Sequence, residues 1–422
     1  MASRTTAITH DHYRGTFGWL AGYLPEDLGS LNHWLNNLQA KAAAGFKDTV
    51  GYEHKAVKEL SDLIADNGVV RMYLTRSIDE AKACGAVNIE NIADMLRQLD
   101  LICKLAPVYN KDKNNRVFFP MSALFVHVMA MPTGKSLFRD SAFNGGLRRI
   151  LETWAQYLDS TGSLSVLNKD PKTGWLGTDA IKEFELELFE INWNEEHGGF
   201  RSYNDFFHRE IYPRNRPVCD PNDSRIIVSA NDGTVYRIDQ DVQAFDAFWI
   251  KEKRYSLSYM LNNPDPKTLE KFIGGTVVQV FLSGADYHRW HAPVDGVVHY
   301  KYVKGLLFSE NDDNSYDPDA GVLSQVYGAE VNNRGLAAIT ANDSRLGTVY
   351  VVPIGITEIS SLTFTAEDGH AIKKGAELGY FSYGGSTLCL VFEKKVKLDF
   401  GELKEKASIK VNAKIARLVT DG

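Results

Sequence analysis

Two histidines stand three residues apart in the segment DYHRWHAP, residues 286–293. Imidazole titrates near neutral pH, so His288 and His291 could supply a general base together with an acid or an orienting group. A structural turn with solvated histidines is one alternative. A metal site is another, but the sequence has no HExxH motif or nearby Cys/His set to complete it. The pair therefore favours catalysis.

A Gly-Gly-Ser-Thr run at 384–387 leads into the apolar segment 388–392. Paired glycines allow positive φ angles and leave the Gly385–Ser386 peptide open to close approach. A hydroxyl beside such a peptide can attack the carbonyl that precedes it. Because glycine and serine are also the usual residues of turns, the run taken alone favours a plain β-turn.

The segment SANDG, residues 229–233, offers a carboxylate. An Asn-Asp-Gly sequence between β-branched runs is typical of a tight hairpin turn, which is the simpler interpretation. In the other interpretation, Asp232 orients a histidine as the third member of a Ser-His-Asp relay. Three segments that are distant in sequence would then act together.

The elements that must position these residues change in character along the chain. Up to about residue 195, apolar residues recur every three or four positions, as one face of a helix requires. Four such stripes lie within 28–38, 57–64, 89–103 and 147–158. We expect them to form the core of a helical domain.

Residues 193–222 are rich in Asn, Asp, Gly, Arg and Pro, which places a domain boundary there. After it, short β-branched runs alternate with Asp-Gly, Asn-Asn and Gly-Gly turns. The sequence therefore predicts an α+β protein, with a helical N-terminal domain at 1–195 and a β-rich domain of short antiparallel strands at 196–422. The rhythm of 368–381 occurs in biotin- or lipoate-carrying modules, but their lysine motif is missing. A non-enzymatic, carrier-like β-domain protein is thus one hypothesis.

Composition excludes several classes of protein. The 422 residues carry a formal net charge of −7, which argues against a nucleic-acid partner. Four cysteines without a CxxC pair fit free thiols in a reducing compartment. No apolar run reaches the roughly 18 residues of a membrane-spanning helix, and the first residues lack an apolar signal core. We expect a cytoplasmic protein without a stable membrane anchor.

Taken in order, SANDG, DYHRWHAP and the late Gly-Ser-Thr resemble the phosphatidylserine decarboxylase family. That family carries an S-P-A-D-G-like segment, then D-Y-H-R-x-H-x-P, then G-S-T or G-S-S before an apolar strand. Further blocks match at 202–209 with 216–218 (SYNDFFHR and RPV) and at 374–381 (KGAELGYF). The resemblance covers roughly residues 200–422, and it implies a carboxy-lyase that depends on a pyruvoyl group.

The resemblance also implies an inactive proenzyme that cuts itself between Gly385 and Ser386. His291, oriented by Asp232, would take the proton from Ser386 Oγ, and the alkoxide would attack the Gly385 carbonyl. The resulting ester would break by β-elimination and, after loss of ammonia, leave a pyruvoyl group in place of Ser386. The remaining 37-residue α chain, 386–422, is too short to fold alone and would stay embedded in the longer β chain.

In the family, the pyruvoyl ketone forms a Schiff base with the substrate amine and accepts the electron pair when CO2 leaves. It does the work that pyridoxal phosphate does in other enzymes, so no pyridoxal phosphate is expected. By family match, His288 positions the substrate carboxylate or supplies a proton to the carbanion.

The helical part resembles a soluble subgroup of the family that decarboxylates aromatic L-amino acids. The similar segments are GWL at 18–20, APVY at 106–109, GWL at 174–176, YHRWHAPV at 287–294 and TEIS at 357–360. They imply tryptophan or hydroxytryptophan as substrate. Because Asp232 follows the pattern of the lipid enzymes, phosphatidylserine stays the alternative.

An aromatic substrate needs an apolar slot, and three aromatic residues lie beside the motifs. Trp290, Phe381 and Tyr383 are the candidate substrate-binding residues, although each also suits a plain core. The expected partners are therefore a small aromatic amino acid and the chain's own C-terminal fragment. Nothing in the sequence specifies an oligomeric state.

The loop DDNSYDPD, residues 312–319, concentrates oxygen ligands. Asp312, Asp317 and Asp319 are candidate calcium ligands, because calcium favours oxygen-rich loops. The loop lacks the spacing of an EF-hand and its closing glutamate. A solvated acidic loop is the favoured interpretation.

Overall fold

The computed structural model describes residues 25, 28–46, 51–86, 88–245, 255–284, 286–308, 325–358, 361–383 and 386–419. They form two compact units. The helical unit takes the described residues up to 187 with 191–207 and 306–308, and the sheet unit takes 188–190, 208–305 and 325–419. The chain thus passes from one unit to the other and back near residue 190. The domain limits of 1–195 and 196–422 stay a prediction.

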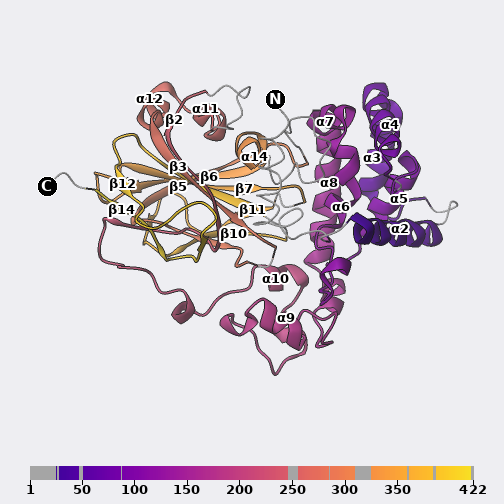
Figure 1. The fold of residues 1–422 in the computed structure, drawn as a ribbon, viewed down its shortest axis with the longest axis horizontal. Coiled ribbons are helices and arrows are strands. Elements are labelled where there is room, and N and C mark those ends of the chain that lie inside the picture. The colour runs from indigo at the N-terminus through magenta and orange to yellow at the C-terminus, as the bar shows by residue number, and fades with distance from the viewer. Residues whose placement is uncertain are drawn as a thin grey trace, which may run out of the picture. The chain divides into compact units, whose positions relative to one another are not determined.

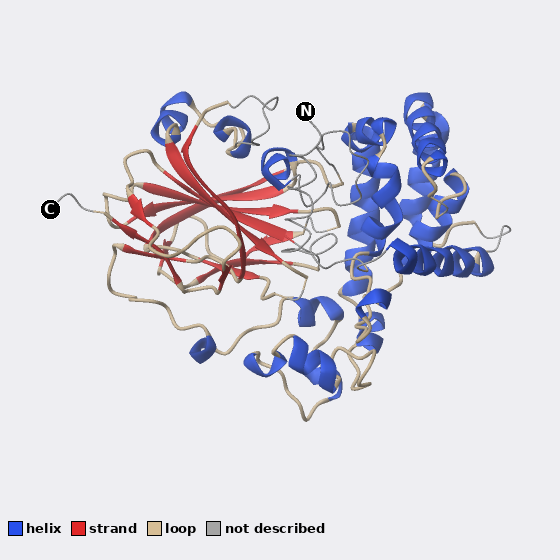
Figure 2. Cartoon of the chain, in the orientation of Figure 1, coloured by secondary structure: helices blue, strands red, loops and turns tan. Residues whose placement is uncertain are grey.

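Helices dominate the first unit (Figures 1 and 2). They are α2 (Leu28–Gly45), α3 (Lys55–Asp66), α4 (Gly68–Ala83), α5 (Ile92–Ile102), α6 (Pro120–Ala130), α7 (Pro132–Arg139), α8 (Ser141–Leu158), α9 (Thr178–Glu183) and α10 (Tyr203–Phe207). Short 3-10 turns are η2 (Lys113–Asn115), η3 (Thr161–Val166), η4 (Leu186–Leu188, at the boundary with the sheet unit) and η5 (Glu196–Gly199).

Most residues of the predicted apolar stripes are buried in helices, which confirms these stretches as helical core. Leu31 and Leu35 of α2 and Leu60 of α3 are fully buried. α2 packs against α5, and α3 packs against α8. Trp154 of α8 is also buried, and its indole N–H donates to the Leu105 carbonyl at 2.8 Å. None of the described helices combines the length and apolar character that a membrane span requires.

The sheet unit is built from antiparallel strands (Figure 2). Its eight-stranded sheet has the order β13 (Ser408–Ile409), β2 (Gly233–Val242), β3 (Gly275–Leu282), β11 (Ser386–Phe392), β7 (Thr348–Gly355), β6 (Arg334–Ala341), β5 (Gly296–Val303) and β9 (Ala371–Ile372). Two three-stranded sheets have the orders β1 (Ile226–Val228), β14 (Lys414–Leu418), β12 (Leu398–Asp399) and β4 (Arg289–His291), β10 (Glu377–Phe381), β8 (Leu362–Phe364). The short helices of this unit are α11 (Leu257–Met260), α12 (Pro266–Phe272), α14 (Gln325–Val331) and η6 (Pro213–Asn215). Helices in one unit and antiparallel sheets in the other confirm the α+β class.

β11 lies in the interior of the eight-stranded sheet, between β3 and β7. All seven of its residues are buried, and each has a partner residue on both neighbours. A strand covered on both faces needs an uninterrupted apolar run rather than an alternating pattern. The run Leu388–Phe392 supplies it, which explains why this segment forms an inner strand.

The chain passes between the same two sheets at two places. β3 leads into β4, and β10 leads into β11; β3 pairs with β11, while β4 pairs with β10. The Phe381 N–H at the end of β10 donates to the His288 carbonyl just before β4, at 3.0 Å. This pairing brings the start of β11 and the DYHRWHAP segment into one region.

We expect truncation of a buried side chain in β11 to destabilise the fold far more than truncation of the exposed Val419 side chain. Val391→Ala should lower the free energy of unfolding by about 2–3 kcal/mol, because Val391 is 1% exposed and its methyl groups fill the core. The matched control Val419→Ala, at a position 46% exposed, should change it by less than about 0.5 kcal/mol. Urea unfolding followed by circular dichroism measures both. Equal losses in the two variants would contradict the inner position of β11.

Candidate active site

Ser386 opens β11. Its backbone pairs with Leu282 at the end of β3 and with Gly355 at the end of β7. The side chain is fully buried, and the hydroxyl has no hydrogen-bond partner among the described residues. An unpaired buried polar group costs about 1–3 kcal/mol, so such groups are uncommon unless they serve a purpose. No hydrogen bond from a described residue therefore competes with a reaction of this hydroxyl. Gly385, the residue before Ser386, lies outside the described residues.

The backbone of β4 joins the motifs predicted from sequence. The His291 N–H donates to the Ala230 carbonyl of the SANDG segment at 2.7 Å. The next residue, Ala292, donates its N–H to the Ala376 carbonyl of the KGAELGYF segment at 2.8 Å. The DYHRWHAP segment therefore lies between the other two.

The imidazole of His291 has a partner on each ring nitrogen. Nδ1 lies 2.8 Å from the Gly375 carbonyl oxygen, and Nε2 lies 3.2 Å from the Tyr287 hydroxyl. A carbonyl oxygen only accepts hydrogen bonds, so we assign the proton to Nδ1 and the lone pair to Nε2. Burial raises the pKa of Tyr287, which keeps its phenol protonated and able to donate to Nε2. This tautomer makes Nε2 the basic atom.

The surroundings of His291 favour its neutral form. Burial lowers the pKa of His291. The hydrogen bond to Gly375 and the charges of Glu377 and Asp232 raise that pKa, while the Arg289 guanidinium lowers it, but burial has the largest effect. A histidine that stays neutral near pH 7 is available as a general base.

Asp232 is a buried carboxylate held by cations. Arg216 donates from Nε to Oδ1 at 3.0 Å and from Nη2 to Oδ2 at 2.6 Å. The Val411 N–H donates to Oδ1 at 2.8 Å, and the Lys410 ammonium lies 3.5 Å from Oδ2. A buried carboxylate needs hydrogen bonds and opposite charge to offset the loss of its hydration. A bidentate guanidinium–carboxylate pair is the strongest such interaction.

No direct hydrogen bond joins Asp232 to His291 within the described part of the chain. Both ring nitrogens have the other partners described above, and the carboxylate accepts from Arg216 and Val411. Asp232 acts on the imidazole through its charge, which raises the pKa of His291. In this state the Gly375 carbonyl orients the ring, and a direct Asp232–His291 relay stays a prediction.

His288 is fully buried where the chain enters β4. Its carbonyl accepts from the Phe381 N–H, and β11 with Ser386 begins shortly after Phe381. Arg289 fixes the neighbouring position, since its Nη1 donates to Glu377 Oε2 of β10 at 2.8 Å. His288 therefore lies next to the end of β10, and Ser386 is the first residue of β11, the strand that follows β10.

The three candidate substrate-binding aromatics are buried. Trp290 and Phe381 have no exposed surface, and Tyr383 is 5% exposed. Trp290 packs edge-on against Phe364, with ring centroids 4.9 Å apart, and a Cβ at Gly379 would lie 2.5 Å from its ring. Trp290, a residue of β4, is thus packed tightly against β8 and β10. Contact of these residues with a substrate stays a prediction.

Sequence reasoning missed several groups of the site. In the sequence, Arg216 and Tyr287 were noted only as parts of the family motifs, and neither was predicted to act in the site. Gly375 acts through its carbonyl, which gives no side-chain signal. Asp286 lies in the turn after β3, and its pKa is raised by burial and further by the charge of Asp232. A search for cations near a buried carboxylate could have found Arg216.

Thr387 is anchored by a buried polar network. Its Oγ1 accepts from Gln279 Nε2 at 2.9 Å and donates to the Val280 carbonyl at 3.2 Å. The Tyr255 hydroxyl donates to Gln279 Oε1 at 2.5 Å. Successive side chains of a strand point to opposite faces, so this network fixes β11 from the face opposite Ser386.

The structure does not test the calcium candidates. Asp312, Asp317 and Asp319 lie outside the described residues. Among the residues that the structure does describe, no group of three or more His, Cys, Asp or Glu could hold a metal ion.

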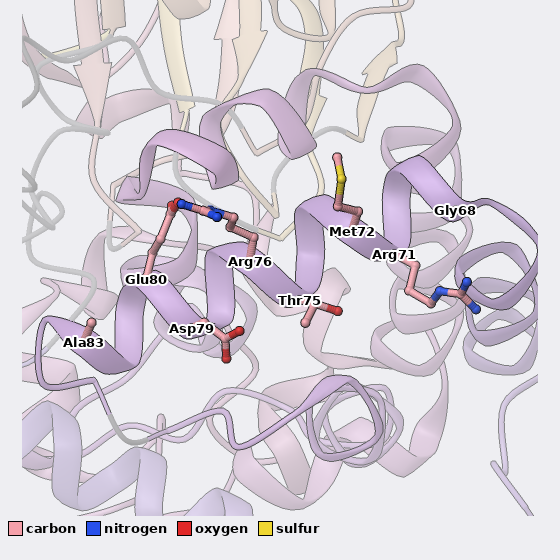
Figure 3. Close-up of a pocket in the computed structure, with 8 residues that line it drawn as sticks. All are labelled: Gly68, Arg71, Met72, Thr75, Arg76, Asp79, Glu80 and Ala83. Atoms are coloured by element: carbon pink, nitrogen blue, oxygen red, sulfur yellow. The ribbon is translucent and has the colours of Figure 1, made fainter.

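A groove of about 620 Å³ runs along α4 in the helical unit (Figure 3). It is lined by Gly68, Arg71, Met72, Thr75, Arg76, Asp79, Glu80 and Ala83. None of the predicted catalytic residues lines it. Arg76 Nε donates to Glu80 Oε1 at 3.1 Å along the same helix. Figure 3 shows these two side chains pointing toward each other. The groove therefore gives no support to a second reaction centre.

Comparison with known proteins shows similarity along most of the chain. A phosphatidylserine decarboxylase family model matches residues 203–417, and a second phosphatidylserine decarboxylase model matches residues 54–184. Decarboxylase iboD of Amanita muscaria is 34% identical over 337 residues, covering 74% of this chain and 95% of the relative. L-Tryptophan decarboxylase of Psilocybe cubensis is 32% identical over 449 aligned positions, covering 99% and 97%. A phosphatidylserine decarboxylase proenzyme of Fusobacterium nucleatum is 33% identical over 221 residues, covering 52% and 68%.

The similarity runs through both units, and the site residues lie within the larger match. The protein is accordingly a decarboxylase, a carboxy-lyase. The chain belongs to the phosphatidylserine decarboxylase family.

We expect His291 to contribute to acid sensitivity. Its pKa is below the usual 6.5 in the folded protein, so under that pH the unfolded chain binds a proton that the folded chain does not. The stability linked to His291 is complete above about pH 6.5 and is lost as the pH falls through the folded pKa. Urea midpoints measured between about pH 7 and 5 should fall less in His291→Gln than in the parent.

The parent, His291→Gln and the control variant all carry Ser386→Ala, so that they have the same covalent structure. His299→Gln is the control, because the His299 side chain is 65% exposed. Parallel pH curves for the parent and His291→Gln would show that His291 is not a buried neutral imidazole.

Proposed function

We propose that the chain is a pyruvoyl-dependent decarboxylase of aromatic L-amino acids, matured by its own cleavage at Gly385–Ser386. The observation that carries the proposal is the buried hydroxyl of Ser386 at the start of an inner strand, which has no hydrogen-bond partner among the described residues. The relatives named as proenzymes support a matured precursor. The relatives named L-tryptophan decarboxylase support the substrate class.

The residues at Ser386 fit the formation of a pyruvoyl group. That group must come from a serine whose hydroxyl is not tied up by other bonds, and Ser386 Oγ meets this condition among the described residues. β11 holds Ser386 by its main chain on both sides, through Leu282 and Gly355. The side chain can therefore react while the strand stays fixed.

Maturation follows from the basic Nε2 of His291. This atom takes the Ser386 hydroxyl proton, and the oxygen attacks the preceding carbonyl carbon as the Gly385–Ser386 C–N bond breaks. The resulting ester eliminates the carboxylate of Gly385, and loss of ammonia from the dehydroalanine that remains, with water added, leaves the pyruvoyl group. In this step the Tyr287 hydroxyl gives up its bond to Nε2.

In the mature protein, the pyruvoyl group supplies an electron sink for the pair released with CO2. His288, buried just before β4 and bonded through its carbonyl to the Phe381 N–H, positions the substrate carboxylate or returns a proton to the substrate carbon. Burial of this region keeps water from competing for that proton. Asp232 and Arg216 form a fixed charge pair at the edge of the site.

Cleavage should be visible as a mass change. The parent chain is expected to give a fragment of about 4 kDa, from 37 residues of average mass, with a pyruvoyl N-terminus. Ser386→Ala should stay at the full 47.2 kDa, because the attacking oxygen is gone. Ser382→Ala, four residues upstream, is the control and should still be cut. Intact-mass spectrometry measures the masses of all three proteins. A parent chain that keeps its full mass would refute the proposed cleavage.

The substrate is tested by release of CO2. We expect release from L-tryptophan or 5-hydroxy-L-tryptophan and none from vesicles of phosphatidylserine, assayed with the carboxyl-labelled compounds. Ser386→Ala should release none from either, since it forms no electron sink. Release from phosphatidylserine alone would establish the lipid alternative. Cleaved protein without activity on either class would refute the proposed substrates and leave the maturation proposal standing.

A further inference from the structure

The ammonium group of Lys374 is enclosed by main-chain carbonyls. Lys374 is 6% exposed, and its Nζ donates to Asp220, Ile226 and Asp223 carbonyls at 2.8, 3.1 and 2.9 Å. An ammonium group has three donors, and all three are used here. A buried lysine of this kind is unusual, because moving its charge from water is costly unless every proton is bonded.

The same residue is tied to the DYHRWHAP segment by its main chain. The Lys374 N–H donates to Asp295 Oδ1 at 3.1 Å, and the Gly375 N–H donates to the Ala292 carbonyl at 2.8 Å. These two bonds set the direction of the next carbonyl, that of Gly375. That carbonyl accepts from His291 Nδ1 at 2.8 Å.

The turn at Gly375 combines a backbone conformation that favours glycine with a space too small for a side chain. Gly375 has a φ of 82°, and a Cβ there would come within 2.3 Å of Val218. Val218 precedes the 220–226 loop whose carbonyls hold the Lys374 ammonium. The buried Lys374 side chain therefore joins the turn at Gly375 to the 220–226 loop.

The 220–226 loop also connects the two ends of the buried charge pair. Arg216 lies just before it, and Asp232 follows it after β1. Asn412 bonds the Arg216 carbonyl through its side chain at 3.0 Å. One ammonium group thus joins the segment that carries the Arg216–Asp232 pair to the carbonyl that orients His291.

We propose that Lys374 is a positioning residue for His291: its ammonium, held by three carbonyls, fixes the Gly375 carbonyl that keeps the imidazole proton on Nδ1 and the lone pair on Nε2. The proposal deepens the proposed function, because it rests on His291 as the base of maturation. It assigns Lys374 no contact with the substrate or with the reacting atoms.

The tautomer of His291 tests the proposal without any cleavage. The probe is the long-range 15N–1H spectrum of 15N-histidine-labelled protein in a Ser386→Ala background, with the His291 signal assigned by His291→Gln. The parent should show a single Nδ1–H tautomer. Lys374→Met should show a mixture of tautomers, because the turn that carries the Gly375 carbonyl then loses its three bonds to the 220–226 loop. An unchanged tautomer in folded Lys374→Met would overturn the proposal.

The rate of cleavage is the second readout. In the chain with Ser386 intact, Lys374→Met should slow the appearance of the small fragment roughly 10- to 100-fold, the usual effect of a misplaced catalytic group. The matched control is Lys373→Met on the same turn, whose side chain is 85% exposed. Cleavage of Lys374→Met as fast as Lys373→Met would refute the positioning role. A parent chain that is not cut refutes the proposed function instead, and the tautomer measurement still decides the role of Lys374.

Rescue separates positioning from general stability. Lys374→Ala removes a propylammonium equivalent, so propylammonium chloride should restore the tautomer and the cleavage rate, while sodium chloride at the same ionic strength should not. Equal effects of the two salts would contradict the role of the ammonium group. If Lys374→Met does not fold, Lys374→Arg is the deciding variant. Once folded, it should keep the parent tautomer because it retains a multidentate cation, and loss of that tautomer would contradict the proposal.

Discussion

The register of β11 between β3 and β7 is the constraint on which the candidate site depends. It sets Ser386 opposite Leu282 and Gly355, at the end of two neighbouring strands. A slip of one residue would turn the Ser386 side chain to the other face and expose the apolar run behind it to the wrong layer. Because the strand is buried on both faces, such a slip would disrupt the whole sheet. The serine is therefore placed by the packing of residues that do no chemistry.

The buried charges near the candidate site are stabilised by hydrogen bonds and ion pairs. Two buried ionic groups are enclosed by partners: Asp232 by Arg216 and a main-chain N–H, and Lys374 by three carbonyls. His291 differs, because it is kept neutral by burial and is bonded through a tautomer that leaves one lone pair. The fixed charges stabilise the segments around the imidazole, and the imidazole keeps the capacity to change its protonation state.

Some of this could be predicted from sequence, where the signal is a pattern along the chain. The run 388–392 predicted a strand, and the spacing of leucines predicted the helices. The partner of Asp232 could not be predicted in the same way, because a Ser-His-Asp pattern points to His291 and says nothing of Arg216. The carbonyl of Gly375 is invisible to any reasoning from side chains. What decides such contacts is the compensation of a buried charge, which depends on the folded arrangement.

The topology also explains how a chain cut before Ser386 would hold together. The described residues after that position form β11, β12, β13 and β14. β11 pairs along its whole length with β3 and β7, β13 lies on the edge beside β2, and β14 lies between β1 and β12. Three of the four strands are thus paired with strands from the preceding part of the chain. Breaking one peptide bond removes none of these ladders, so a proenzyme with this topology can use its central strand for chemistry and still keep its fold.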